Sequence, residues 1–154
     1  MLAQVVSHCS EKERVVFTCT TNSKKIISFC ASSDDKYLQY RFGTLDKIEL
    51  LYPNQLIQPK GLINAEVEPM PLNDDGTRNE NINLQFKINS FTYSLDFETV
   101  RNYVNIGKKQ DIRENSSANL FVMKDDKQIA KLQCAKNSIS NVTKNILRDF
   151  DVLN

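Results

Sequence analysis

The 154-residue chain has room for one domain with a hydrophobic core, and its 20 Lys and Arg residues are balanced by 19 Asp and Glu residues. The formal net charge of +1 leaves no overall field that would recruit nucleic acid or an anionic membrane, so neither partner is predicted. No apolar run approaches the roughly 20 residues that a membrane-spanning helix requires, so no membrane span is predicted. We expect a single domain over residues 1–154, and the sequence does not indicate its oligomeric state.

The first residues indicate an exported chain. Leu2 and Ala3, which precede Gln4, resemble the small-residue cleavage site of an export signal. We therefore interpret the sequence as a mature or nearly mature form in which residues 1–13 make an N-terminal arm.

The predicted sheet begins with a hairpin. Residues 15–20 and 24–30 are rich in β-branched and apolar side chains, and they flank Asn22 and Ser23, which favour a tight turn.

Four cysteines, at positions 9, 19, 30 and 134, are compatible with two disulfides, a zinc site or buried thiols. No two of them have the tight C-x-x-C spacing that usually supplies a pair of zinc ligands, so no metal is predicted. The only histidine, His8, adjoins Cys9 without a catalytic signature around it, which disfavours a cysteine nucleophile. Two disulfides are the preferred interpretation, and inert buried thiols are the alternative.

The hairpin register indicates how the cysteines pair. It places Cys19 opposite Ile26, about 13 Å along the strands from Cys30, whereas a disulfide needs Cα atoms within about 7 Å. Cys9 lies just before the strand that faces Cys30, so we predict the pairs Cys9–Cys30 and Cys19–Cys134. Such crosslinks persist in an oxidising compartment, which predicts the periplasm or the extracellular space.

Residues 37–52 predict a second hairpin that turns after Gly43. Its inward side chains are predicted to be Leu38, Tyr40, Phe42, Ile48, Leu50 and Tyr52. The outward side chains of Tyr37, Gln39 and Arg41 form a stripe of residue types that are enriched in binding hot spots, and we take them as candidate binding residues. The alternative is a solvated sheet face on which Arg41 pairs with Glu49.

Residues 53–80 contain all four prolines and two of the four glycines, which predicts a loop region with one short strand at 62–67. Lys60, next to Gly61, lies in this projecting loop and is a further candidate binding residue.

The clearest signal is the alternation of apolar and polar residues over 82–88 and again over 91–97. A two-residue turn at Asn89 and Ser90 pairs the two segments, and these two residues complete the candidate binding set. Another hairpin is predicted over 118–134.

That last hairpin turns at Asp125 and Asp126. The polar run 107–119 before it predicts a mobile connection. Apolar residues at helical intervals over 138–150 predict a short C-terminal helix. The sequence as a whole predicts an all-β fold, an antiparallel meander of about eight strands that forms a small barrel or sandwich.

The strings "VVFTCTTNSKKIISFCAS", "KYLQYRFG", "KIELLYP" and "IAKLQC" resemble a group of small exported Gram-negative bacterial proteins of uncharacterised function. The plan of a cysteine-stapled β domain is also similar to that of the periplasmic and membrane-bound inhibitors of c-type lysozyme. Those inhibitors are small β-barrels that insert a loop into the carboxylate-lined cleft of a lysozyme. Their S-G-x-x-Y loop motif is absent here, since "NSFTYS" lacks the glycine and the spacing, so no inhibitory residue is assigned by motif.

The sequence contains no phosphate-binding loop, zinc-protease helix or G-x-S-x-G turn, and it predicts neither an enzyme nor a cofactor. We therefore expect a periplasmic or secreted protein that binds and inhibits a lysozyme or a cell-wall-degrading toxin. The alternative is a β-barrel that binds a small ligand or a glycan, in its interior or on a tyrosine-rich face.

Overall fold

The computed structural model describes residues 6–69 and 78–140, which contain nine strands and one 3₁₀ turn. The elements are β1 (Glu13–Thr20), β2 (Ile26–Ser32), β3 (Leu38–Thr44), β4 (Lys47–Tyr52), β5 (Ile63–Pro69), β6 (Arg78–Ile88), β7 (Phe91–Ile106), β8 (Lys109–Lys124), β9 (Lys127–Gln133) and the 3₁₀ turn η1 (Lys136–Ser138). Each strand pairs antiparallel with the next strand of its sheet. The predicted all-β meander is therefore confirmed.

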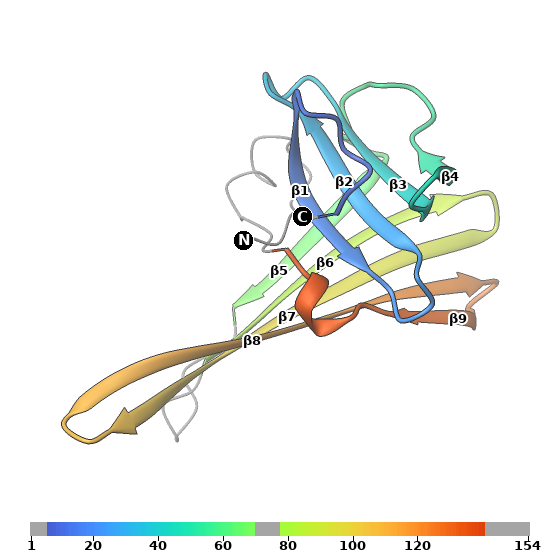
Figure 1. Ribbon diagram of the computed structural model, residues 1–154. Coiled ribbons are helices and arrows are strands. Elements are labelled where there is room, and N and C mark those ends of the chain that lie inside the picture. The colour runs from blue at the N-terminus through green and yellow to red at the C-terminus, as the bar shows by residue number, and fades with distance from the viewer. Residues whose placement is uncertain (1–5, 70–77, 141–154) are drawn as a thin grey trace.

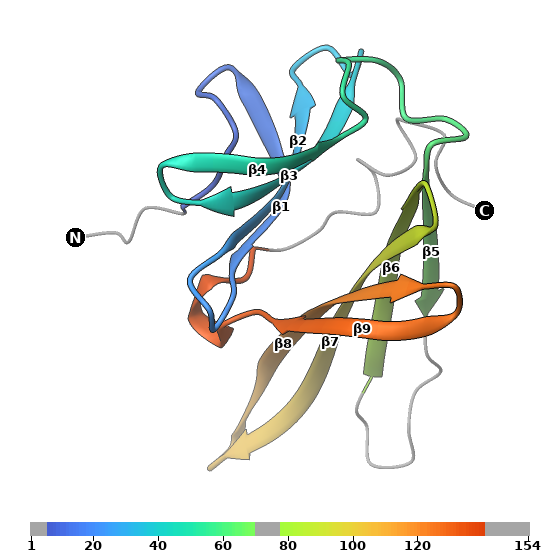
Figure 2. The same cartoon turned by 90° about the vertical axis from the view of Figure 1, so that its right-hand side faces the viewer.

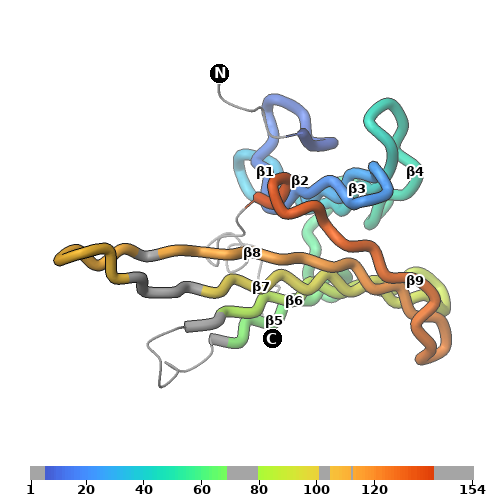
Figure 3. The backbone as a smooth tube through the Cα atoms, turned by 60° about the horizontal axis from the view of Figure 1, so that its bottom comes forward, coloured from blue at the N-terminus to red at the C-terminus, as the bar shows by residue number. Residues whose placement is uncertain are grey.

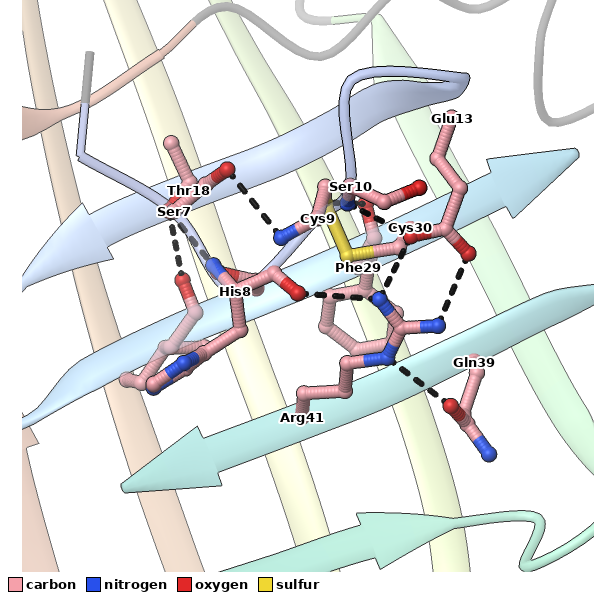
Figure 4. The surroundings of a disulfide bond; sticks show 12 residues. Ser7, His8, Cys9, Ser10, Glu13, Thr18, Phe29, Cys30, Gln39 and Arg41 are labelled. Atoms are coloured by element: carbon pink, nitrogen blue, oxygen red, sulfur yellow. Dashed lines mark hydrogen bonds and ion pairs between the residues drawn. A yellow bond between two sulfur atoms is a disulfide. The ribbon is translucent and has the colours of Figure 1, made fainter. Parts of the chain in front are cut away.

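The strands form two sheets, one of four strands in the order β1-β2-β3-β4 and one of five in the order β5-β6-β7-β8-β9. The sheets face each other as two layers (Figure 1 and Figure 2). Strands of the first sheet run across those of the second, which lie behind them in Figure 4. Of the two predicted architectures, the structure therefore shows a sandwich and not a closed barrel.

Both sheets contribute to one hydrophobic core, since the alternating residues of each sheet point into the space between them. Phe17 and Phe29 come from the first sheet, and Leu84, Phe86 and Leu95 come from the second. The largest fully buried side chains of the described core are those of Phe17, Phe29, Tyr40, Ile27, Leu38, Ile63, Ile82, Leu84, Phe86, Leu95 and Leu120.

Aromatic rings fill much of the space between the layers. Phe86 stacks on Tyr52 at a centroid distance of 4.9 Å and on Tyr93 at 5.2 Å, and Tyr40 contacts Phe86 at 4.8 Å. Such ring contacts add to the free energy of burial.

A β-bulge changes one predicted side-chain direction. The register of β3 and β4 shifts between Phe42 and Gly43, so that Phe42 faces Leu50 while Gly43 faces Ile48. The shift breaks the regular alternation, and Ile48, which was predicted to point inward, is 41% exposed.

A second bulge shifts the first hairpin. The register of β1 and β2 changes between Val15 and Phe17, so Cys19 lies opposite Ile27 and not opposite Ile26 as predicted.

Two predicted connections and the predicted helix differ in part from the structure, whereas the short strand predicted at 62–67 is present as β5. The polar run 107–119 is not a mobile loop, because most of it belongs to β8. The loop region 53–80 contains the short strand β5, close to the predicted 62–67, and also the beginning of β6. Of the predicted helix 138–150, the described part shows only the last residue of the 3₁₀ turn, and 141–150 lie outside the described residues, as do residues 1–5 of the arm.

Both predicted disulfides are present. Cys9 and Cys30 have Cα atoms 5.4 Å apart, and Cys19 and Cys134 have Cα atoms 5.7 Å apart. Cys9–Cys30 fastens the N-terminal arm to β2. Cys19–Cys134 joins β1 of the first sheet to the residue that follows β9 of the second.

The segment after Cys134 continues along the free edge of β1. Ala135 donates its amide to the carbonyl of Thr20 at 2.8 Å, and Ser140 donates its amide to the carbonyl of Thr18 at 2.9 Å. An edge strand that is hydrogen-bonded in this way is protected from pairing with another chain. The same segment therefore closes one side of the sandwich.

We expect loss of the Cys19–Cys134 crosslink to destabilise the protein more than loss of Cys9–Cys30. The two disulfides span 115 and 21 residues, for which the chain-entropy model gives about 5 and about 3 kcal/mol. Urea unfolding of Cys19→Ala/Cys134→Ala and Cys9→Ala/Cys30→Ala measures both, and an equal or reversed loss would contradict this assignment.

We expect Gly43→Ala to destabilise the fold by about 3 kcal/mol, because overpacking displaces backbone that cannot yield. A Cβ atom at Gly43 would clash with the carbonyl oxygen of Lys47 and would lie 2.8 Å from the amide nitrogen of Glu49. The control is Gly107→Ala, where φ is +63°. There, an added Cβ atom would meet no described atom within 4 Å other than those of Gly107 and its two chain neighbours, so that only about 1 kcal/mol of backbone strain is expected. Equal unfolding free energies for the two variants would refute the close approach at Gly43.

Candidate functional site

A buried ion pair holds the N-terminal arm over the outer face of the first sheet. Arg41 on β3 donates from Nη1 and Nη2 to the two carboxylate oxygens of Glu13, at 2.6 and 2.8 Å. Nη1 also donates to the carbonyl of His8, at 2.9 Å, as Figure 4 shows. The arm thus crosses the sheet face and is held there by hydrogen bonds from the guanidinium group.

Neighbouring polar groups complete this network. Gln39 accepts a hydrogen bond from Nε of Arg41 at 2.8 Å and donates to the carbonyl of Pro53 at 2.8 Å. Tyr37 donates its hydroxyl to Glu13 at 2.6 Å. The pKa of Glu13 is lowered from 4.5 to about 2, chiefly by its hydrogen bond with Arg41, and the pKa of Tyr37 is raised by its hydrogen bond with Glu13.

The structure therefore brings Tyr37, Gln39 and Arg41 together, but in a covered network and not on an open face. Arg41 is only 9% exposed and Gln39 is buried. The alternative pairing of Arg41 with Glu49 is wrong, since Glu49 pairs with Lys25 at 2.6 Å. Sequence reasoning missed Glu13 as the partner because Glu13 begins β1 and Arg41 lies on β3, so the two residues meet only after both strands have paired with β2.

The other candidate residues lie elsewhere. Lys60 and the Asn89-Ser90 turn are exposed. A groove of about 370 Å³ is lined by Gly61, next to Lys60, and by Lys87, two residues before Asn89. Lys60 lies in the segment that links β4 to β5, and Asn89 and Ser90 form the turn between β6 and β7. None of these three residues hydrogen-bonds to Arg41 within the described part of the chain.

The most prominent surface feature is a two-stranded ribbon formed by β7 and β8. Among the described residues, β6 pairs with β7 only as far as Arg101, and β9 pairs with β8 only as far as Asn119. Beyond these points, residues 102–106 and 109–113 have strand partners only in each other within the described part of the chain. The ribbon projects past the sandwich, as Figure 1 and Figure 3 show, and at 3.4 Å per residue it reaches about 17 Å.

The tip of the ribbon combines an apolar and two cationic side chains. Ile106 is 55% exposed, and Lys108 and Lys109 follow it across a turn that begins at Gly107, where φ is +63°. Sequence reasoning missed this tip because residues 109–117 of β8 contain a single apolar residue, Ile112, and so lack the alternation that predicts a strand. The usable signal was the glycine, which favours the first position of a two-residue hairpin turn.

The described ranges contain no group of three or more His, Cys, Asp or Glu side chains that could hold a metal ion. In the same ranges, no helix has the length and apolar character to cross a membrane. The two disulfides are compatible with a compartment outside the cytosol.

Comparison with protein-family models, curated proteins and solved structures finds no match to this chain. The similarity to exported bacterial proteins and to lysozyme inhibitors therefore stays a prediction from the sequence.

We expect Glu13→Gln to destabilise the protein by about 3 kcal/mol at pH 7, since it leaves the buried Arg41 without its counter-charge. Because the folded-state pKa of Glu13 is depressed, its contribution is present above pH 4.5 and is lost as the pH falls towards 2. Urea unfolding between pH 2 and pH 7 should therefore show a shallower pH dependence for Glu13→Gln than for the wild type.

The matched control is Glu11→Gln, which makes the same change at an exposed position of the arm. It should keep the wild-type stability within about 0.5 kcal/mol and the wild-type pH dependence. Identical pH profiles for Glu11→Gln and Glu13→Gln would contradict the role of the ion pair.

Proposed function

We propose that the protein is an exported inhibitor that binds a lysozyme or a cell-wall-degrading toxin and blocks its cleft with the β7–β8 ribbon. The observation that carries this proposal is the ribbon itself, which extends beyond both sheets and presents exposed side chains at residues 105–111. The proposed place of action is the periplasm or the extracellular space, where the partner enzymes degrade the wall.

The chemistry of the tip suits a carboxylate-lined cleft. Enzymes that hydrolyse glycosidic bonds use a pair of Asp or Glu side chains beside the scissile bond. The ammonium groups of Lys108 and Lys109 are complementary in charge to such a pair, and charge complementarity favours rapid and specific association. Ile106 supplies the apolar anchor that interface centres require.

The scaffold supports insertion because it limits the entropy lost on binding. The strands of the ribbon continue directly from the five-stranded sheet, and that sheet is joined to the first by Cys19–Cys134. A preformed element loses less conformational freedom in a complex than a disordered loop does. This is an argument for a binding role that needs no catalytic group.

The test combines binding and lysis. The purified, oxidised protein is immobilised and exposed to a panel of lysozymes and peptidoglycan hydrolases, and the rate at which each enzyme clears a suspension of cell walls is measured with and without the protein. We expect at least one enzyme to be retained and its lytic rate to fall. If none is retained and no rate changes, the proposed function is wrong.

Matched substitutions at the ribbon tip and on β9 test which of the two surfaces inhibits the enzyme. Ile106→Asp and Lys109→Glu alter the ribbon tip, whereas Ile129→Asp and Lys127→Glu make the same changes on β9, where Ile129 is 54% exposed. Loss of a central anchor or of a complementary charge typically weakens binding by about 2 kcal/mol, or roughly thirtyfold. Inhibition constants should rise by that factor for the tip variants only, and an equal effect of the β9 variants would exclude the ribbon as the inhibitory element.

A further inference from the structure

A small apolar pocket opens between the two sheets, at the end of the sandwich formed by the β1–β2 turn. Its volume is about 230 Å³, and its lining is almost entirely hydrophobic. The fully buried part, which we call the floor, consists of Tyr40 and Leu120, with Val122 beside them. The partly or fully exposed part, which we call the rim, comprises Lys25, Phe42, Glu49, Leu50, Tyr93 and Leu132.

The floor contains a polar group that lacks a partner. Tyr40 is 0% exposed, and no atom within residues 6–69 and 78–140 hydrogen-bonds to its hydroxyl. A buried hydroxyl left without a partner costs about 1–3 kcal/mol, so a bound group that pairs with it would recover that free energy. Burial raises the pKa of Tyr40 above its ordinary value of 10, which keeps the hydroxyl protonated and able to donate.

The charges at the rim do not select a charged ligand. Lys25 and Glu49 neutralise each other through an ion pair of 2.6 Å. The floor carries no charge, and placing an ion against Leu120 and Val122 without a counter-ion would be costly. The pocket therefore favours a molecule that is neutral.

We propose that this pocket binds a small neutral aromatic molecule with one hydroxyl or carbonyl oxygen, which pairs with the hydroxyl of Tyr40. The size agrees with this class, since an enclosed cavity of about 150 Å³ accommodates benzene and the pocket here offers about 230 Å³. The rings of Tyr40, Phe42 and Tyr93 supply aromatic faces and edges for the bound ring. The site is independent of the ribbon, so this inference stands or falls separately from the proposed inhibition.

Two matched probes, 4-propylphenol and propylbenzene, test the proposal on the full, oxidised chain. Each is titrated into ¹⁵N-labelled protein while the amide resonances of Phe42, Leu120 and Leu132 are followed. We expect saturable shifts at these three residues, and about tenfold tighter binding of the phenol, which corresponds to one hydrogen bond. No saturable shift with either probe, or shifts confined to other surfaces, would overturn the proposal.

Tyr40→Phe isolates the hydroxyl. The variant should bind both probes equally, with the affinity that the wild type has for propylbenzene, and its urea midpoint in the absence of probe should be unchanged or higher because an unpartnered hydroxyl has been removed. A persistent preference for the phenol, or a lowered urea midpoint, would show that the hydroxyl is already paired and would overturn the assignment.

Leu132→Trp is the second variant, because an indole at the rim fills the pocket without a change in the buried floor. It should abolish the binding of both probes while the fold, checked by the remaining amide resonances, is retained. Unaltered binding by a folded Leu132→Trp variant would place the probes elsewhere and would overturn the proposal.

Discussion

The crosslink between Cys19 and Cys134 is the constraint on which the rest of the structure depends. It lies where β1, an edge of the first sheet, meets the end of β9, an edge of the second. The hydrogen bonds of Ala135 and Ser140 to β1 follow directly from this attachment. Without it, the two layers would be held on this side only by side-chain packing and by a few backbone hydrogen bonds, such as that from the amide of Asn22 to the carbonyl of Gln133 in the described part of the chain. With it, one side of the sandwich is closed by a covalent bond, and the two sheets are held in a fixed relative position.

Two features follow from the unequal size of the layers. The second sheet has strands of 16 residues in β7 and β8, whereas the longest strand of the first sheet has eight. At one end the excess length leaves the sandwich as the ribbon that carries Ile106 and its neighbouring lysines. At the other end, the crossing of the layers leaves the apolar pocket beside Tyr40. The ribbon proposed to inhibit the partner enzyme and the proposed ligand pocket therefore lie at opposite ends of β7 and β8.

Local patterns predicted much of this fold, and long-range contacts account for what they missed. Apolar and polar residues alternate over 82–88 and over 91–97, and this alternation predicted the register that the structure shows for the hairpin. It could do so because successive residues of a strand point to opposite faces of the sheet. Alternation fails where a bulge inserts a residue, as at Gly43, or where a strand contains a single apolar residue, as in 109–117. The Glu13–Arg41 pair was not predictable from spacing, since the two residues lie on strands that are separated by β2 and meet only in the assembled sheet.

The pairing of the sulfur atoms is the most direct test, because the proposed export, the closed side of the sandwich and the fixed ribbon all depend on it. Natively purified protein, alkylated without prior reduction and then digested, should incorporate no alkyl group at any of its four cysteines. It should yield peptide pairs linked only through Cys9–Cys30 and Cys19–Cys134. Alkylated thiols, or a link between Cys19 and Cys30, would contradict the account.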